Sequence, residues 1–177
     1  MLARMLLMTV AGVLMSIPPA QAVSELWQAE ARPDGATQYS CGEACGQTQL
    51  ICVHEIVPDQ QPVRIEDIAD EAVTPWEQID YSLIFRMAGD RGGAAGAGKN
   101  INGKRLKGPV IVSFGGADWV SAEYQIGAKA GDLEAQALLW PVKEGVSILR
   151  CGYNGAADND GAVVAVRQLA ESLRLTP

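Results

Sequence analysis

The sequence has a single histidine, His54, and only two phenylalanines among its 177 residues. It shows no internal repeat with a period of about 20–50 residues, which excludes solenoid and propeller architectures. It also contains no complete catalytic motif and no nucleotide or haem signature. Because histidine is the side chain most often used as a general base, these absences together favour a protein without catalytic activity.

Basic residues are in the minority. The chain has 14 lysines and arginines against 21 aspartates and glutamates, a formal net charge of −7 at pH 7. A net acidic chain repels phosphate backbones and anionic lipid headgroups on average, so neither nucleic acid nor a charged membrane surface is an expected partner. Beyond the first residues, no apolar run is long enough to cross a bilayer.

The N-terminal residues have the pattern of a secretory signal peptide. Arg4 supplies a positive charge, the uncharged apolar stretch Met5–Met15 follows, and Ala20–Ala22 has the small-x-small form of a cleavage site. The apolar stretch is shorter than the roughly 20 residues that a transmembrane helix needs. We predict cleavage after Ala22, which leaves residues 23–177 as one exported globular domain in the periplasm or outside the cell.

Four cysteines are the most distinctive chemical groups of this domain: Cys41, Cys45, Cys52 and Cys151. In an oxidising compartment an even number of cysteines favours disulfides, and four cysteines allow three connectivities. We predict one local bridge and one bridge to Cys151, and the spacing leaves open which other cysteine Cys151 joins. A bridge between Cys52 and Cys151 would close a long loop and stabilise the fold by about 4–5 kcal/mol.

The same stretch of sequence has an alternative interpretation. Cys41, Cys45, Cys52 and His54 have the spacing C-x3-C-x6-C-x-H, and three sulfurs with an imidazole suit zinc or copper. Cysteines this close together could also carry thiol-redox chemistry. The alternative is therefore a metal-binding (Cu or Zn) or thiol-redox protein, whereas the disulfide interpretation requires no cofactor.

A glycine-rich segment, residues 89–108, is predicted to be a flexible loop because no apolar period survives in it. Its stretch Gly93–Asn100 is close to the P-loop pattern, but Asn100 stands where the magnesium-binding hydroxyl belongs. Five basic residues make this segment a candidate partner-binding loop: Arg91, Lys99, Lys104, Arg105 and Lys107. A basic loop on an acidic domain suits an anionic ligand or another protein.

The apolar patterning predicts an α+β fold with a mainly antiparallel sheet, arranged as a meander in the second half of the chain. Residues 32–47 are predicted to be loop. The strands are predicted at Leu50–Val57, Asp80–Met87, Val110–Phe114, Val120–Ile126 and Val146–Tyr153. Leu133–Trp140 alternates like a further strand, although its alanine content also suits a helix.

The same patterning predicts few helices. A short helix is expected at Ile65–Val73, and Thr74–Glu77 has the form of a capping box that begins another brief helical turn. The best helical pattern is Ala162–Leu173, whose apolar stripe includes Val163, Val166 and Ala170 and is expected to pack across one face of the sheet.

These features together predict a small exported protein stabilised by disulfides, with a binding, inhibitory or accessory role and no catalytic activity. Its partner is expected to be another protein or an anionic ligand in the exported compartment.

Overall fold

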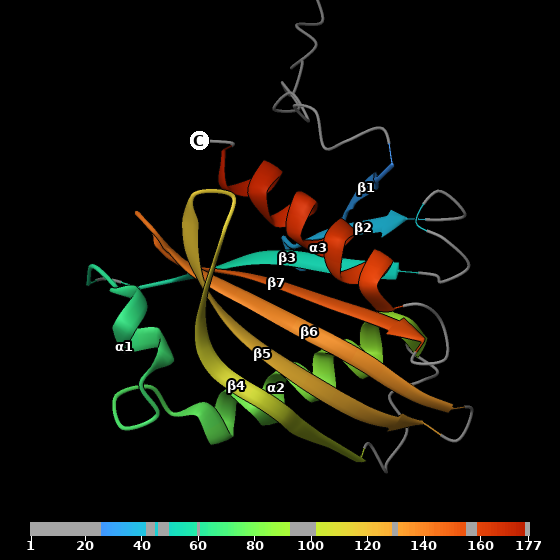
Figure 1. The fold of residues 1–177 in the computed structure, drawn as a ribbon, viewed down its shortest axis with the longest axis horizontal. Helices are drawn as coiled ribbons and strands as arrows, with labels where there is room; N and C mark the ends of the chain where they lie inside the picture. The colour runs from blue at the N-terminus through green and yellow to red at the C-terminus, as the bar shows by residue number, and fades with distance from the viewer. Residues whose placement is uncertain are drawn as a thin grey trace, which may run out of the picture.

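The computed structural model describes residues 26–41, 45, 50–59, 61–92, 102–128, 131–154 and 159–175. Seven strands form one sheet in the order β1-β2-β3-β7-β6-β5-β4, and every neighbouring pair is antiparallel (Figure 1). The predicted α+β class is confirmed, and so is the meander, because β4 to β7 are neighbours in sequence order.

The described chain runs through three strands, two helices, four further strands and a last helix. The strands are β1 Gln28–Ala31, β2 Thr37–Cys41, β3 Leu50–Pro58, β4 Asn102–Phe114, β5 Ala117–Ala128, β6 Gly131–Val142 and β7 Gly145–Asn154. The helices are α1 Ile65–Ala69, α2 Trp76–Gly92 and α3 Asn159–Arg174. The predicted strand at Leu133–Trp140 is therefore confirmed as part of β6, because its alternate side chains reach the two covered faces of the sheet.

One face of the sheet packs against α3, which crosses it in Figure 1. The helix buries Ala162, Ala165, Val166, Leu169 and Ala170 against this face. The predicted stripe holds at Val166 and Ala170, which are fully buried, whereas Val163 is only half-buried. Under the helix, Trp119 and Trp140 meet edge to face with ring centroids 4.9 Å apart. All four tryptophans of the chain are buried and therefore belong to the core.

The opposite face is covered by α1 and α2, which the sequence did not predict as a layer (Figure 1). The predicted strand at Asp80–Met87 is wrong, because these residues lie within the 17-residue helix α2. Leu83 and Met87 are each 3% exposed and lie one turn apart, whereas Tyr81 is 75% exposed. Apolar residues at every second position suit a strand, but those four positions apart also suit one side of a helix. The helix forms because it buries that side.

The junction between α1 and α2 is held by side-chain hydrogen bonds to the backbone of α1. The Thr74 hydroxyl donates to the Asp67 carbonyl at 2.5 Å, and Trp76 Nε1 donates to the Ile68 carbonyl at 2.7 Å. The Thr74 hydroxyl, which was predicted to cap the following helix, thus bonds to the preceding helix α1. Helix α1 ends at Ala69, whereas the prediction extended it to Val73.

The predicted loop at residues 89–108 is wrong at both ends. Its first residues belong to α2 and its last seven to β4, while residues 93–101 lie outside the described chain. A Cβ on Gly103 would lie 2.5 Å from Ile84 Cγ2, so this glycine lets α2 approach β4 closely. Gly108 has a φ of +89° beside irregular pairing with β5. These glycines allow close packing around a strand. A glycine-rich composition alone does not distinguish such a strand from a loop.

The predicted loop at residues 32–47 contains β2. A turn precedes this strand, in which the Asp34 carboxylate accepts a hydrogen bond from the Ala36 amide at 3.2 Å. This bond is the main reason that the pKa of Asp34 lies below its usual value. The strand then buries Tyr39 and Cys41 on one face, an alternation too short to be clear in the sequence.

Candidate functional site

The four cysteines form two pairs at disulfide distance. Cys41 pairs with Cys45, with 5.7 Å between their Cα atoms, and Cys52 pairs with Cys151, with 4.0 Å between theirs. One bridge is thus local and one reaches Cys151. The second joins directly opposed residues of β3 and β7, 99 positions apart in the chain. The pairing suggests an oxidising, exported environment.

His54 lies two residues after Cys52 on β3, so strand alternation places both on the α3 side of the sheet. Its Nε2 shares a hydrogen bond of 2.6 Å with the Ser147 hydroxyl, and its ring stacks on Trp140 at 5.6 Å. Burial lowers the pKa of His54, which keeps the imidazole neutral, and the nearby Glu55 opposes this effect. Ser147 is 1% exposed, so its hydroxyl is buried and does not form an accessible nucleophile with the half-buried His54.

The proposed ligand set Cys41, Cys45, Cys52 and His54 is not assembled by the structure. Its three sulfurs are held in the two disulfides, and His54 bonds to a serine. Within the described residues, no three or more cysteine, histidine or acidic side chains are grouped as a metal would need. A disulfide sulfur is not a thiolate, which is the form that binds metal or attacks as a nucleophile.

Of the five basic residues of the predicted partner loop, the structure describes the side chains of Lys104, Arg105 and Lys107. Arg105 lies on β4, donates to Glu71 at 2.6 Å, lies 3.4 Å from Asp80, and covers the Trp76 ring at 5.6 Å. It thereby fastens β4 to α2 and to the turn after α1, so its charge is already matched by acids.

The other two described basic residues of this segment lie on the same strand as Arg105. Lys107 pairs with Glu123 at 3.6 Å, and Lys104 is exposed on β4. Lys99 and the side chain of Arg91 lie outside the described residues. Binding of an anionic partner by this segment stays a prediction.

A cleft among the described residues lies between the helices α1 and α2 and the β3–β7 part of the sheet. Its volume is about 630 Å³, within the range of roughly 300–1,000 Å³ typical of ligand sites. Leu139, Val146 and Ile148 line it from the sheet. Ile79, Ser82 and Leu83 line it from α2. The remaining aliphatic residues come from β3, α1 and their connections: Val57, Val63, Ile68 and Val73.

An ion-pair network borders this cleft. Arg86 of α2 donates to both carboxylate oxygens of Glu55 on β3, each at 2.6 Å, and Arg150 of β7 donates to the same carboxylate at 2.7 Å. The side chain of Arg150 is 2% exposed, that of Glu55 is 19% exposed and that of Arg86 is 48% exposed. The network therefore runs from the core to the surface and fixes α2 to β3.

Two further carboxylates, Asp59 and Asp67, line the cleft. Asp59 accepts a hydrogen bond from the Gln61 amide at 3.0 Å, and no ion pair is formed by either aspartate with the described residues. With Glu55 and Arg86, the lining thus carries three carboxylates and one guanidinium, a formal charge of −2. The cleft combines aliphatic walls with an acidic rim.

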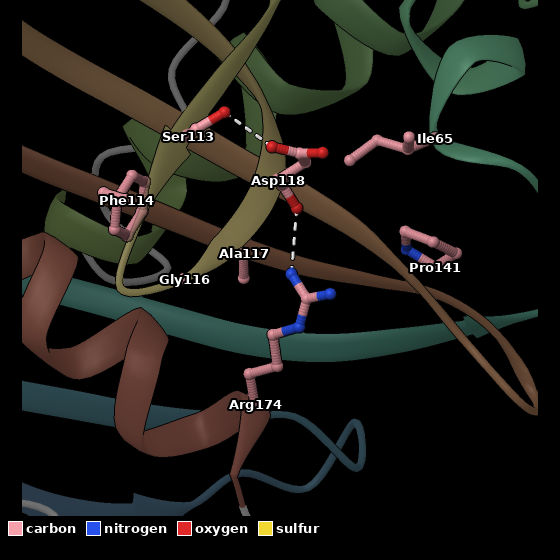
Figure 2. Close-up of a pocket in the computed structure, with 8 residues that line it drawn as sticks. All are labelled: Ile65, Ser113, Phe114, Gly116, Ala117, Asp118, Pro141 and Arg174. Atoms are coloured by element: carbon pink, nitrogen blue, oxygen red, sulfur yellow. Dashed lines mark hydrogen bonds between the residues drawn. The ribbon is translucent and has the colours of Figure 1, made fainter.

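A second cleft, of about 430 Å³, lies where the β4–β5 hairpin meets the end of α3 (Figure 2). Figure 2 shows Ser113 donating to the Asp118 carboxylate and Arg174 donating to the Asp118 carbonyl, at 2.6 Å and 2.9 Å. The Arg174 guanidinium also covers the Trp119 ring at 5.1 Å. These polar groups fasten α3 to the hairpin, so this cleft is better explained as a structural junction.

Sequence reasoning missed the first cleft and its ion pairs. Arg150 gave one usable signal, a lone charge inside the apolar strand Val146–Tyr153. Arg86 gave no such signal, because it lay in the segment Asp80–Met87 that was predicted to be a strand. The sequence matches no protein-family model and no curated protein. Fold and cleft together define a small α+β protein with two disulfides and a ligand-sized cleft, and its function is inferred from that geometry.

Proposed function

We propose that the protein is an exported, disulfide-stabilised binding protein that holds its ligand in the cleft between α1, α2, β3 and β7. The cleft itself carries this proposal, because it joins a ligand-sized volume to aliphatic walls and a few polar groups. We propose further that residues 1–22 are a signal peptide and that the domain acts in the periplasm or outside the cell.

The lining favours binding over catalysis. None of the residues known to line the cleft is a cysteine, histidine or lysine, and Glu55 is held by two arginines. Both oxygens of this carboxylate already accept hydrogen bonds from guanidiniums, so they are not free to contact a reacting group. What the cleft offers a ligand is apolar contact, charge and shape.

One described feature supports export: the paired cysteines suit an oxidising compartment. No helix in the described part of the chain is long and apolar enough to span a membrane. The compartment is tested by expressing the full chain with its native N-terminus and determining the mass and first residue of the exported product, which is expected to begin at Val23.

The binding proposal is tested by amide NMR on residues 23–177 with hexanol, hexylamine and hexanoate as soluble aliphatic probes. Chemical-shift changes are expected to cluster at residues lining the cleft, including Ile79, Ser82 and Val146. Ser82→Trp would fill the cleft and should abolish them. Tyr81→Trp is the matched control, since Tyr81 is 75% exposed and does not line the cleft. Shift changes that are absent, scattered or unaffected by Ser82→Trp would contradict the proposal.

A further inference from the structure

β3 is paired on both sides along only part of its length. Leu50 to His54 pair with β2, whereas Glu55 to Pro58 pair with β7 alone in the described chain. The second half of β3 therefore presents an open strand edge. Its side chains are also accessible, with Ile56 49% and Val57 44% exposed.

The backbone groups on this edge follow from the register. Directly opposed residues of antiparallel strands alternate between hydrogen-bonded pairs and closer, non-hydrogen-bonded pairs. The Cα atoms of Cys52 and Cys151 are 4.0 Å apart, so these residues form a non-hydrogen-bonded pair. Because the two types of pair alternate, Ile56 and Ser147, four residues further along the strands, form another non-hydrogen-bonded pair. The N–H and C=O of Ile56 therefore point away from β7, toward the side on which the described chain supplies no pairing strand.

The outer edge of the sheet at β4 is a poorer docking edge. It carries Lys104, Lys107 and Pro109, and its pairing with β5 is irregular on both sides of Lys107. Edge lysines, prolines and bulges are the usual features that prevent a strand from accepting another.

The cleft borders the open half of β3, because Glu55 and Val57 belong to both. In an added strand, alternate side chains would point to this face of the sheet and could enter the aliphatic cleft. There they would meet Asp59 and Asp67, which have no basic partner in the described chain. The charge of the rim therefore suits lysine or arginine in that strand.

We propose that the open half of β3 accepts an extended segment of a partner protein, which pairs with Ile56, inserts aliphatic side chains into the cleft and places a basic residue at its rim. This inference rests on the proposed binding function and names the class of its ligand.

The test uses heptapeptides displayed on phage and selected against immobilised residues 23–177. Enriched peptides are expected to alternate aliphatic with other residues and to carry lysine or arginine. The most enriched one is then synthesised with a fluorophore, and its affinity is measured by anisotropy. Ile56→Pro removes only an outward N–H and should weaken binding about tenfold. Ile56→Val keeps this N–H and should bind like the parent.

Two further variants test the cleft and the charge. Ser82→Trp should abolish peptide binding, whereas Tyr81→Trp should not. The double variant Asp59→Asn, Asp67→Asn should lose the preference for basic over neutral peptides. Circular dichroism melting of each variant shows whether it is folded. If Ile56→Pro fails to fold, competition between the peptide and the aliphatic probes decides: displacement supports the proposal, and simultaneous binding overturns it.

Other outcomes separate this inference from the function on which it rests. If no peptide is enriched but the aliphatic probes still bind at the cleft, the site belongs to a small molecule and the strand-pairing inference is overturned. The same holds if the peptide binds equally to a folded Ile56→Pro variant. If neither peptides nor probes bind, the proposed binding function fails as well.

Discussion

Cys52 and Cys151 lie directly opposite each other on β3 and β7, and their disulfide joins positions 99 apart in the chain into one long loop. The double variant Cys52→Ala, Cys151→Ala should lower the free energy of unfolding by about 4–5 kcal/mol, because the unfolded chain regains the entropy of that loop. Removing Cys41 and Cys45 together should cost only about 2 kcal/mol, since that loop is short.

Denaturant titrations measure both losses, and thiol titration of the unreduced protein should find no free cysteine. Equal losses from the two double variants, or two free thiols in the native protein, would contradict this assignment.

Stability is expected to fall on mild acidification because of His54. Burial lowers its pKa in the folded state, while in the unfolded chain it titrates near its usual value of about 6.5. The unfolded state therefore binds the proton more readily, and stability decreases as the pH falls through that value until the folded histidine is also protonated. Because His54 is the only histidine of the chain, the imidazole NMR signal reports the pKa of His54 directly.

His54→Gln provides the control for this prediction, because it removes the titration. The part of the pH dependence between about pH 7 and 5 should then disappear. An imidazole that titrates above pH 6.5 in the folded protein would disprove the stated cause.

Arg150 and Arg86 bind one carboxylate from very different environments, so their removal should have unequal effects. Arg150→Met leaves a partly buried charge with one fewer partner and should destabilise the protein by about 3 kcal/mol. Arg86→Met removes a half-exposed ion pair and should cost at most about 1 kcal/mol. Urea unfolding curves compare them, and a larger loss for Arg86→Met would mean that burial does not determine the strength of this network.

Two glycine substitutions should shift stability in opposite directions. Gly108→Ala should lower it by about 2–4 kcal/mol, because the residue has a positive φ and a Cβ there would collide with the Ser121 carbonyl oxygen. Gly89→Ala should raise it by up to about 1 kcal/mol, because Gly89 lies within α2 and a Cβ there would have open space. Thermal melting gives both signs, and a stabilised Gly108→Ala variant would contradict the packing described for β4.

The parts of the fold that were predicted correctly are those with a long, unambiguous pattern. β5 has side chains that alternate between the two faces over its length, and α3 has a continuous apolar stripe. The prediction failed where a short segment fitted two periods, as at Tyr81 to Met87. It also failed at Gly103 and Gly108, where glycine permits close packing in a strand.

The cleft was beyond sequence reasoning for a different reason. Its lining joins the consecutive elements β3, α1 and α2, with Val57, Asp67 and Ser82, to β6 and β7 much further along the chain, with Leu139 and Ile148. No local pattern relates these residues, and only the pairing of β3 with the last strand brings them together.

The sequence by itself determined the α+β class, the meander and the four cysteines suited to pairing, because these depend on local periodicity and on residue chemistry. The tertiary structure decided which cysteine Cys151 joins, which segment covers the second face, and where β3 stays open beside an acidic cleft. The reason is that each of these depends on which residues far apart in the chain become neighbours, and the register between β3 and β7 sets that proximity.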